Sequence, residues 1–192
     1  MDSVIAGRVV VITGGSAGIS RPAVELFARR GAHVVLAARG ARRGQEVATQ
    51  LQAEGCHVLF VQADVARSED VERLISTTLE SFGRIDCAFN NAAALAKIRR
   101  SAEYSEAEFD TEATLNFKGV WLCMKHENRG KEKAGSARRR DRQHFFCKRS
   151  QRRERCLALC NGEGWCARIN QVCCSGVFQG RNSCERFGSG WF

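Results

Sequence analysis

No apolar run in this sequence is long enough to cross a bilayer, so a membrane span is not predicted. The first residues lack a basic stretch followed by an apolar one, and we therefore expect no secretory signal. The chain has a single tyrosine, Tyr104, so chemistry that depends on a phenol has only that position available. Cysteines are few and scattered before residue 128, as in a reducing compartment, and we expect a cytoplasmic protein.

Apolar residues become scarce after residue 128. Residues 129–192 hold only five Leu, Ile or Val residues but 15 basic and 5 acidic ones, a net charge of +10. Residues 1–128 hold 15 basic and 16 acidic residues, a net charge of −1. Burial of so few apolar side chains cannot offset the conformational entropy that would be lost on ordering the tail. We therefore expect a folded but truncated unit over residues 1–127 and a disordered, basic, cysteine-rich tail over residues 128–192.

Short β-branched runs alternate with helical patterns in the first part of the chain. Strands are predicted over residues 8–12, 33–37, 57–61 and 86–89. Helical patterns lie over residues 22–30, 41–54 and 109–124, and a further helix is predicted to begin at a cap formed by Ser68. This alternation predicts an α/β, Rossmann-like fold with a doubly wound parallel sheet.

A glycine-rich loop, from Thr13 to Ser20, follows the first predicted strand and opens the first helix. Such a turn lets backbone N–H groups and the helix dipole face a pyrophosphate. An isolated loop of this kind is equally compatible with a plain tight turn. Its position between a strand and a helix favours dinucleotide binding here.

The loop resembles the Thr-Gly-x-x-x-Gly-x-Gly motif of the short-chain dehydrogenase/reductase family. Thr13, Gly14 and Gly18 match the motif, whereas Ser20 replaces its last glycine. A side chain at residue 20 is expected to crowd the helix against the sheet or the phosphate. Pro22 is expected in the first helical turn, where its missing N–H costs little.

Later segments extend the resemblance over residues 7–127. Asp64-Val65 matches the family's adenine-contacting pair, and Asn90-Asn91-Ala92-Ala93 resembles its Asn-Asn-Ala-Gly motif. Leu115 to Gly119 resembles the segment whose asparagine, here Asn116, belongs to the catalytic tetrad. The resemblance, together with the charge of Arg39, implies cofactor binding by Thr13, Gly14, Ser16, Gly18, Ile19, Arg39, Asp64, Val65, Asn91 and Ala92.

The end of the second strand, Ala37-Ala38-Arg39, bears on the choice of cofactor. An NAD enzyme commonly places an acid here to bind the ribose 2′-hydroxyl, and this chain has none. The guanidinium of Arg39 suits a 2′-phosphate. We predict NADP(H) as the preferred dinucleotide and NAD(H) as the second, with a solvated surface arginine as the alternative interpretation of Arg39.

The family reaction moves a hydride between nicotinamide and a small carbonyl or alcohol. It uses a tyrosine as acid and base, a lysine four residues later and a serine. Tyr104 is followed by Ser-Glu-Ala-Glu and precedes Asn116, so we interpret it as a surface or loop residue. Asn116 would be the sole surviving tetrad member, and the chain as written is predicted to be inactive.

The missing residues reappear when the tail's codons are read one base out of step. Gln143 to Cys147 then permits Asn-Ile-Ser-Ser-Ala, and Leu157 to Glu163 permits Ser-Leu-Tyr-Ala-Met-Ala-Lys. Family-like sequence continues to Arg186 in the same frame. We infer a one-base frame change between about Glu127 and Arg138, either a true mutation or a sequencing or gene-prediction error.

The tail also allows other hypotheses. Its arginines suggest polyanion binding, and its cysteines with His144 suggest zinc, but no Cys-x-x-Cys pair repeats with finger spacing. We predict neither a metal site nor a specific nucleic-acid partner. The alternatives to the enzyme are a basic polyanion-binding protein and a cofactor-sensing regulator. The resemblance implies a homodimer or homotetramer for intact members, and loss of the later strands would leave the fourth strand's edge uncovered.

Overall fold

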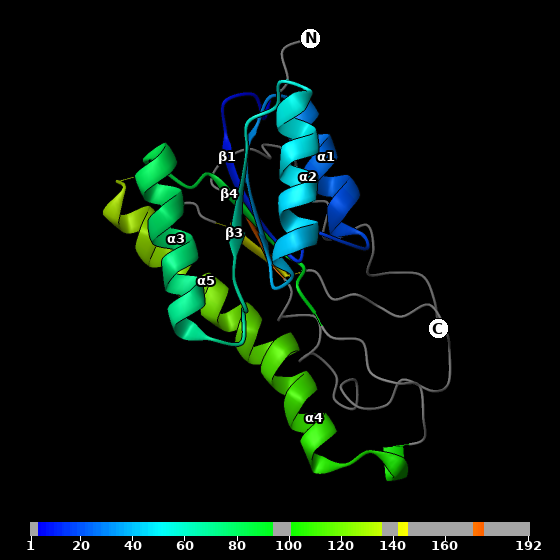
Figure 1. The fold of residues 1–192 in the computed structure, drawn as a ribbon. Coiled ribbons are helices and arrows are strands. Elements are labelled where there is room, and N and C mark those ends of the chain that lie inside the picture. Colours follow the sequence, from blue (N-terminus) through cyan, green and yellow to red (C-terminus); the bar gives the residue numbers. More distant parts are fainter. Residues whose placement is uncertain (1–3, 94–100, 136–141, 146–170, 175–192) are drawn as a thin grey trace, which may run out of the picture.

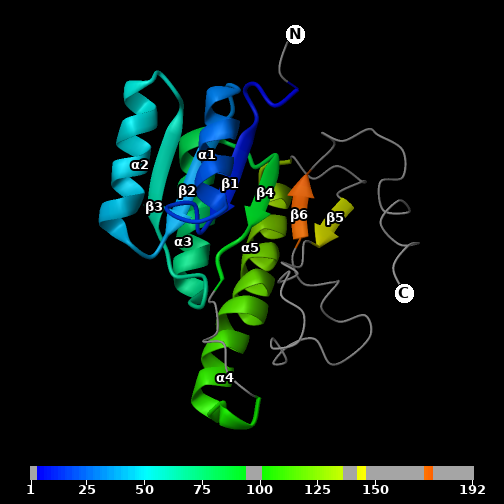
Figure 2. The ribbon, with the colours of Figure 1, turned by 90° about the vertical axis from the view of Figure 1, so that its right-hand side faces the viewer.

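A computed structural model describes residues 4–93, 101–135, 142–145 and 171–174 of the chain. Within these ranges the strands form one sheet in the order β3-β2-β1-β4-β6-β5, which Figure 2 shows side by side. Four strands are parallel: β1 (Val9–Thr13), β2 (His33–Ala38), β3 (Val58–Gln62) and β4 (Cys87–Asn90). The predicted α/β, Rossmann-like fold is confirmed.

Helices cover both faces of the parallel strands. Helices α1 (Ser20–Arg29) and α2 (Ala41–Ala53) lie on one face, and α3 (Ser68–Phe82) and α5 (Gly119–Lys133) lie on the other (Figure 1). Pro22 falls in the first turn of α1, as predicted. None of the described helices is long and apolar enough to cross a membrane.

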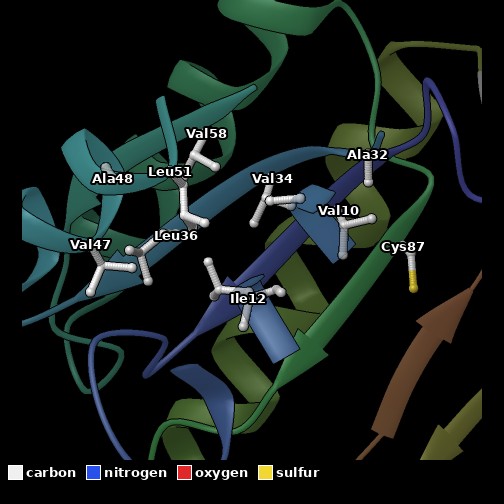
Figure 3. Close-up of a cluster of buried hydrophobic side chains, with 12 residues drawn as sticks. Val10, Ile12, Ala32, Val34, Leu36, Val47, Ala48, Leu51, Val58 and Cys87 are labelled. Carbon is white, nitrogen blue, oxygen red and sulfur yellow. The ribbon is translucent and has the colours of Figure 1, made fainter. Parts of the chain in front are cut away.

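The buried strands explain the continuous apolar runs in the sequence. Successive side chains of a strand point to opposite faces. Val10 and Ile12 therefore pack toward α1 and α2, with Leu51 of α2 in the same cluster (Figure 3), whereas Val11 packs with Leu74 on the α3 side. Each such fully buried aliphatic side chain stabilises the fold by about 1.5–3 kcal/mol.

Two α-helices joined by a π-helical turn follow η1 (Ser101–Glu103), where one helix was predicted over residues 109–124. Helix α4 (Glu106–Ala113) begins earlier than predicted because Ser105 and Glu108 form a capping box, with the Glu108 N–H 3.3 Å from the Ser105 hydroxyl. A π-helical turn, η2 (Thr114–Lys118), then leads into α5. Periodicity alone could not locate this turn, because the apolar spacing continues through it.

Helix α5 continues past Glu127 to Lys133. Gly130 lets it lie close to α3, because a Cβ there would stand 2.7 Å from the Ile75 Cγ2. The start of α3 differs from the prediction in one respect. Arg67 occupies the N-cap position, and the Ser68 hydroxyl lies 3.1 Å from the His126 Nε2 instead of capping the helix.

Two strands of the tail extend the sheet. Strand β6 (Gln171–Cys174) pairs antiparallel with β4, and β5 (Arg142–Phe145) pairs antiparallel with β6. The expectation that the edge of β4 is uncovered was therefore wrong, because an open edge accepts any extended segment that satisfies its backbone groups. The rest of the tail, on which the predictions of disorder and of zinc or polyanion binding mainly depend, lies outside the described residues.

The described cysteines differ in state. Cys56 and Cys123 are free thiols, and burial raises the pKa of the Cys123 thiol well above its usual range. Cys87 is disulfide-bonded, which departs from the free thiols that a reducing compartment favours.

Candidate functional site

The predicted site residues gather at one edge of the sheet. Each lies at or just beyond the carboxyl end of a parallel strand, except Asn116, which lies on η2. In open α/β sheets, ligands bind at the carboxyl ends of the strands. The loops after β1, β2, β3 and β4 therefore form the candidate site.

The loop after β1 is held tightly against the loop after β4. Gly14 has a φ of +73°, a conformation that side chains rarely adopt, and a Cβ on it would stand 2.9 Å from the Cα of Ala92. The Gly14 N–H also donates to the Ala37 carbonyl at 2.8 Å. Gly18 has a φ of +60°, but a Cβ there would meet no atom within 4 Å. The glycine loop is thus closed on one side and open at Gly18.

The N-terminus of α1 is arranged for an anion. Its N-cap residue, Ile19, is 59% exposed and makes no side-chain cap, and its first turn holds no acidic residue. The first turn of α3, by contrast, carries Glu69 and Asp70, and α4 has its capping box. The first N–H groups of α1 and its positive dipole end remain available to a negatively charged group.

Side-chain hydrogen bonds join the glycine loop to the loop after β4. The Thr13 hydroxyl accepts from the N–H groups of Asn91 at 3.1 Å and Ala92 at 3.2 Å. The Ser20 hydroxyl accepts from the Asn91 side-chain amide at 2.5 Å and donates to the Thr13 carbonyl at 3.5 Å. Ser20 is fully buried, so the expected crowding is not seen, because its hydroxyl fills a space between hydrogen-bonding partners.

Asp64 and Val65 lie where β3 ends. One Asp64 carboxylate oxygen accepts from the Ala66 N–H at 3.0 Å, while the Asp64 N–H donates to the Asp70 carboxylate at 2.9 Å. That backbone hydrogen bond, with Arg73 nearby, lowers the pKa of Asp70 despite partial desolvation. Val65 belongs to a buried cluster with Leu115, against which Ala92 packs. Val65 is thereby joined to Leu115 and to the loop after β4.

Asn116 is half-buried in the π-helical turn η2. Such turns occur often at functional sites. Its neighbour Leu115 packs with Val65, so this part of the helix touches the loop after β3. Tyr104, in contrast, precedes α4, and its hydroxyl donates to the Glu112 carboxylate at 3.4 Å. The structure thus places Tyr104 in a loop, as the sequence indicates.

Arg39 lies exposed just beyond the end of β2. Its carbonyl accepts from the Gln62 side-chain amide at 3.0 Å, which ties the ends of β2 and β3 together. Among the ion pairs of the described residues, none involves the guanidinium of Arg39 or Arg43, whereas Arg42 pairs with Glu46 at 3.7 Å. The hydrogen bond from Gln62 therefore involves the backbone of Arg39 and not its guanidinium.

Sequence reasoning missed a buried carboxylate beside the site. Glu127 of α5 is 1% exposed and accepts from the Asn90 side-chain amide at 3.2 Å. Burial raises the pKa of Glu127 to about 7, although Asn90 and Lys131 oppose this shift. Lys131, also 1% exposed, stands one helical turn further along α5. No pattern in the sequence distinguishes this pair from a solvent-facing i,i+4 pair, because burial depends on the rotation of α5 against the sheet.

The buried carboxyl of Glu127 makes the stability pH-dependent. The pKa of Glu127 is about 7 in the folded chain against an ordinary 4.5, so its contribution is fully present below pH 4.5 and is lost as the pH rises through 7. Removing both charges with Glu127→Gln and Lys131→Met should abolish that decline and stabilise the chain at pH 8 by about 1–3 kcal/mol. Urea unfolding of both proteins from pH 5 to 8 measures the difference.

His126 is a second titratable group beside this pair, and desolvation lowers its pKa from the ordinary 6.5. It is kept in both proteins, so its effect on the pH dependence cancels in their difference. Parallel stability curves for the two proteins over the whole range would contradict the assignment to Glu127.

The described ranges hold no group of three His, Cys, Asp or Glu side chains placed to bind a metal ion. A surface hollow along α2 is lined by Arg42, Gln45, Glu46, Thr49 and Gln50, and it includes no residue of the glycine loop. The candidate site is therefore defined by its loops and by the α1 N-terminus.

A parallel sheet with a glycine loop at the N-terminus of its first helix defines a Rossmann-type nucleotide-binding unit. The sequence model of the short chain dehydrogenase family matches residues 8–136. The chain belongs to this family of oxidoreductases.

Relatives of the chain cover its N-terminal part. It is 37% identical over 123 residues to 2,5-dichloro-2,5-cyclohexadiene-1,4-diol dehydrogenase of Sphingobium indicum, covering 64% of this chain and 48% of the relative. It is 37% identical over 126 residues to an A-factor type gamma-butyrolactone 1'-reductase of Streptomyces virginiae, covering 66% and 49%. The chain thus spans about half the length of these curated relatives.

A solved structure is similar to the chain over the same part of the fold. The 3-ketoacyl-(acyl-carrier-protein) reductase of Brucella melitensis, complexed with NADH, superposes with a TM-score of 0.64 at 29% identity. The superposition covers 69% of this chain and 53% of the reductase.

Proposed function

We propose that this chain is the dinucleotide-binding half of a short-chain oxidoreductase. The 192-residue chain binds NADP(H) but does not transfer hydride. The observation that carries the proposal is the closed contact between the glycine loop and the loop after β4, beside an uncapped α1 N-terminus. At Gly14, only a residue without a Cβ fits both the φ of +73° and the approach to Ala92. A nicotinamide dinucleotide, when bound, supplies or accepts the hydride in this family.

The residues present fit such a group. Gly18 leaves open space where a Cβ would stand, and the first N–H groups of α1 face no acidic side chain in their own turn. Thr13, Gly14, Ser16, Gly18 and Ile19 would hold the pyrophosphate side. Asp64 and Val65 would contact the adenine, and the backbone of Asn91 and Ala92 would complete the wall beside Gly14.

The preference for NADP(H) depends on charge at the start of α2. Arg39 precedes the Gly40 N-cap, and Arg42 and Arg43 occupy the first turn, which holds no acid. Cations at a helix N-terminus oppose the helix dipole. An added anion, such as a ribose 2′-phosphate, would relieve that opposition and offer the guanidinium of Arg39 a bidentate partner. NAD(H), which lacks the 2′-phosphate, remains the second cofactor.

Replacing Arg39 should separate the two cofactors. Arg39→Ala is expected to weaken NADPH binding about tenfold, as for loss of one charge-assisted contact worth about 1.4 kcal/mol, and to leave NADH affinity within about twofold. Fluorescence titration of both dinucleotides measures this. Arg30→Ala is the matched control, because Arg30 lies at the C-terminal end of α1, away from the glycine loop. This variant should change the affinity for neither dinucleotide. Equal losses for NADPH and NADH would contradict the 2′-phosphate assignment.

The proposed lack of hydride transfer follows from the residues available. Tyr104 has no lysine one helical turn later, and its hydroxyl is engaged with Glu112. Asn116 remains as the single member of the family tetrad. The frame change proposed between Glu127 and Arg138 accounts for this loss, and a small carbonyl or alcohol is the proposed substrate class of the intact relative. A cytoplasmic, homo-oligomeric enzyme is the proposed ancestral form.

A second candidate function concerns the tail alone. Its net charge of +10 over residues 129–192 favours polyanion binding by a non-enzymatic protein. A cofactor-sensing regulator, which would use the Rossmann half, is a separate alternative. Steep salt dependence would be expected of any such basic segment. Saturable binding of one nucleic-acid sequence or structure over others would support this function over the first.

A further inference from the structure

Ser20 stands where the family motif has a glycine, and it joins the two loops of the candidate site. We propose that Ser20 is a positioning residue of the dinucleotide site, whose hydroxyl holds Asn91 so that the backbone of residues 91–92 stays against the glycine loop. The inference depends on the proposed dinucleotide binding. It concerns a residue at which this chain departs from the motif.

The hydroxyl of Ser20 uses both of its hydrogen-bonding roles. It accepts from the Asn91 Nδ2 at 2.5 Å and donates to the Thr13 carbonyl at 3.5 Å. Ser20 is 0% exposed, so water cannot readily replace either partner. A glycine at this position would offer the Asn91 amide no acceptor.

The hydrogen bond from Asn91 to Ser20 matters because the backbone of residues 91–92 contacts the glycine loop. The N–H groups of Asn91 and Ala92 both donate to the Thr13 hydroxyl, at 3.1 and 3.2 Å. Ala92 in turn lies in the path of any Cβ on Gly14. Both loops are therefore set by the same few contacts, and a side-chain anchor on Asn91 fixes the position of the second loop relative to the first.

Two consequences follow for ligand binding. The side-chain amide of Asn91 serves the protein rather than the dinucleotide, so Asn91 contributes to the site through its backbone. The Ser20 hydroxyl points into the protein and takes no room from a phosphate at the α1 N-terminus. Replacing Ser20 with the family's glycine should therefore weaken binding instead of relieving a clash.

A double-mutant cycle tests the anchor. Ser20→Ala and Asn91→Ala should each weaken NADPH binding about tenfold, equivalent to about 1.4 kcal/mol. The double variant should bind NADPH at most about twofold more weakly than either single variant. Ser20→Thr, which keeps the hydroxyl, should restore most of the affinity. Ser76→Ala is the matched control, since the Ser76 hydroxyl bonds only carbonyls of its own helix. Unchanged affinity in Ser20→Ala, or additive losses in the double variant, would overturn the proposal.

A readout without ligand separates this inference from the proposed function. Amide hydrogen exchange of the free chain should be several-fold faster at residues 91–92 in Ser20→Ala than in the wild type or in Ser76→Ala. If Ser20→Ala does not fold, Asn91→Ala serves for the same comparison. Unchanged exchange there would refute the anchor even if NADPH binds. A wild-type chain that binds neither NADPH nor NADH would refute the proposed function, while the exchange rates would still decide whether Ser20 holds the loop.

Discussion

Gly14→Ala should lower the affinity for NADPH about 100-fold, equivalent to about 2.7 kcal/mol. A side chain at the Gly14 φ of +73° costs about 1–2 kcal/mol. The new Cβ would also stand 2.9 Å from the Ala92 Cα, a backbone atom that cannot rotate away. The loop after β4 would have to move, and its hydrogen bonds to Thr13 would be lost with it. Fluorescence titration of the purified variant measures the change.

Gly55→Ala is the control for backbone strain alone. Gly55 has a φ of +82° at the end of α2, and a Cβ there would meet no atom within 4 Å. This variant should lose about 1 kcal/mol of unfolding free energy and no NADPH affinity. If Gly14→Ala binds NADPH like the wild type, or if both variants lose affinity alike, the glycine loop is not the pyrophosphate site.

Correcting the gene by one base between the codons of Glu127 and Arg138 should create carbonyl reductase activity. The shifted frame permits a tyrosine that begins in the codon of Leu159 and a lysine that begins in that of Glu163, which is the family spacing. General acid–base catalysis typically contributes about 10²–10⁴-fold, so the corrected chain should exceed the 192-residue chain by at least about 10²-fold in NADPH oxidation. A panel of small aldehydes and ketones provides the assay.

Phenylalanine in place of that new tyrosine should remove the gained activity while leaving NADPH binding intact. Sequencing of genomic DNA and transcript across the codons of Met124 to Asp141 decides separately whether the shift exists in the organism. A corrected chain that folds and binds NADPH, but is no more active than the 192-residue chain, would refute the frame hypothesis as the cause of inactivity.

The parallel part of the fold could be predicted because each strand is a short β-branched run that ends in a turn. Val9–Thr13, for example, is buried throughout and is followed at once by the glycine loop. Helices on both faces of a parallel sheet require such continuous apolar strands. The candidate site was predictable for the same reason, because loops after parallel strands share one edge of the sheet.

The features that sequence reasoning missed depend on contacts between distant residues. The role of Ser20 is set by Asn91, and the burial of Glu127 is set by how α5 packs over Asn90. The π-helical turn at Asn116 interrupts an apolar pattern that reads as one helix. Pairing of β6 with β4 was not predicted either, because Gln171–Cys174 carries little strand signal and the open edge of β4 supplies the backbone partners.

The most direct test measures binding and turnover on one sample of the purified 192-residue chain. NADPH and NADH would each be titrated by fluorescence, and oxidation of NADPH would then be followed with a panel of carbonyl compounds. The proposed function predicts saturable binding, tighter for NADPH, with no oxidation above the rate without protein. Turnover of NADPH by this chain, or failure to bind either dinucleotide, would contradict it.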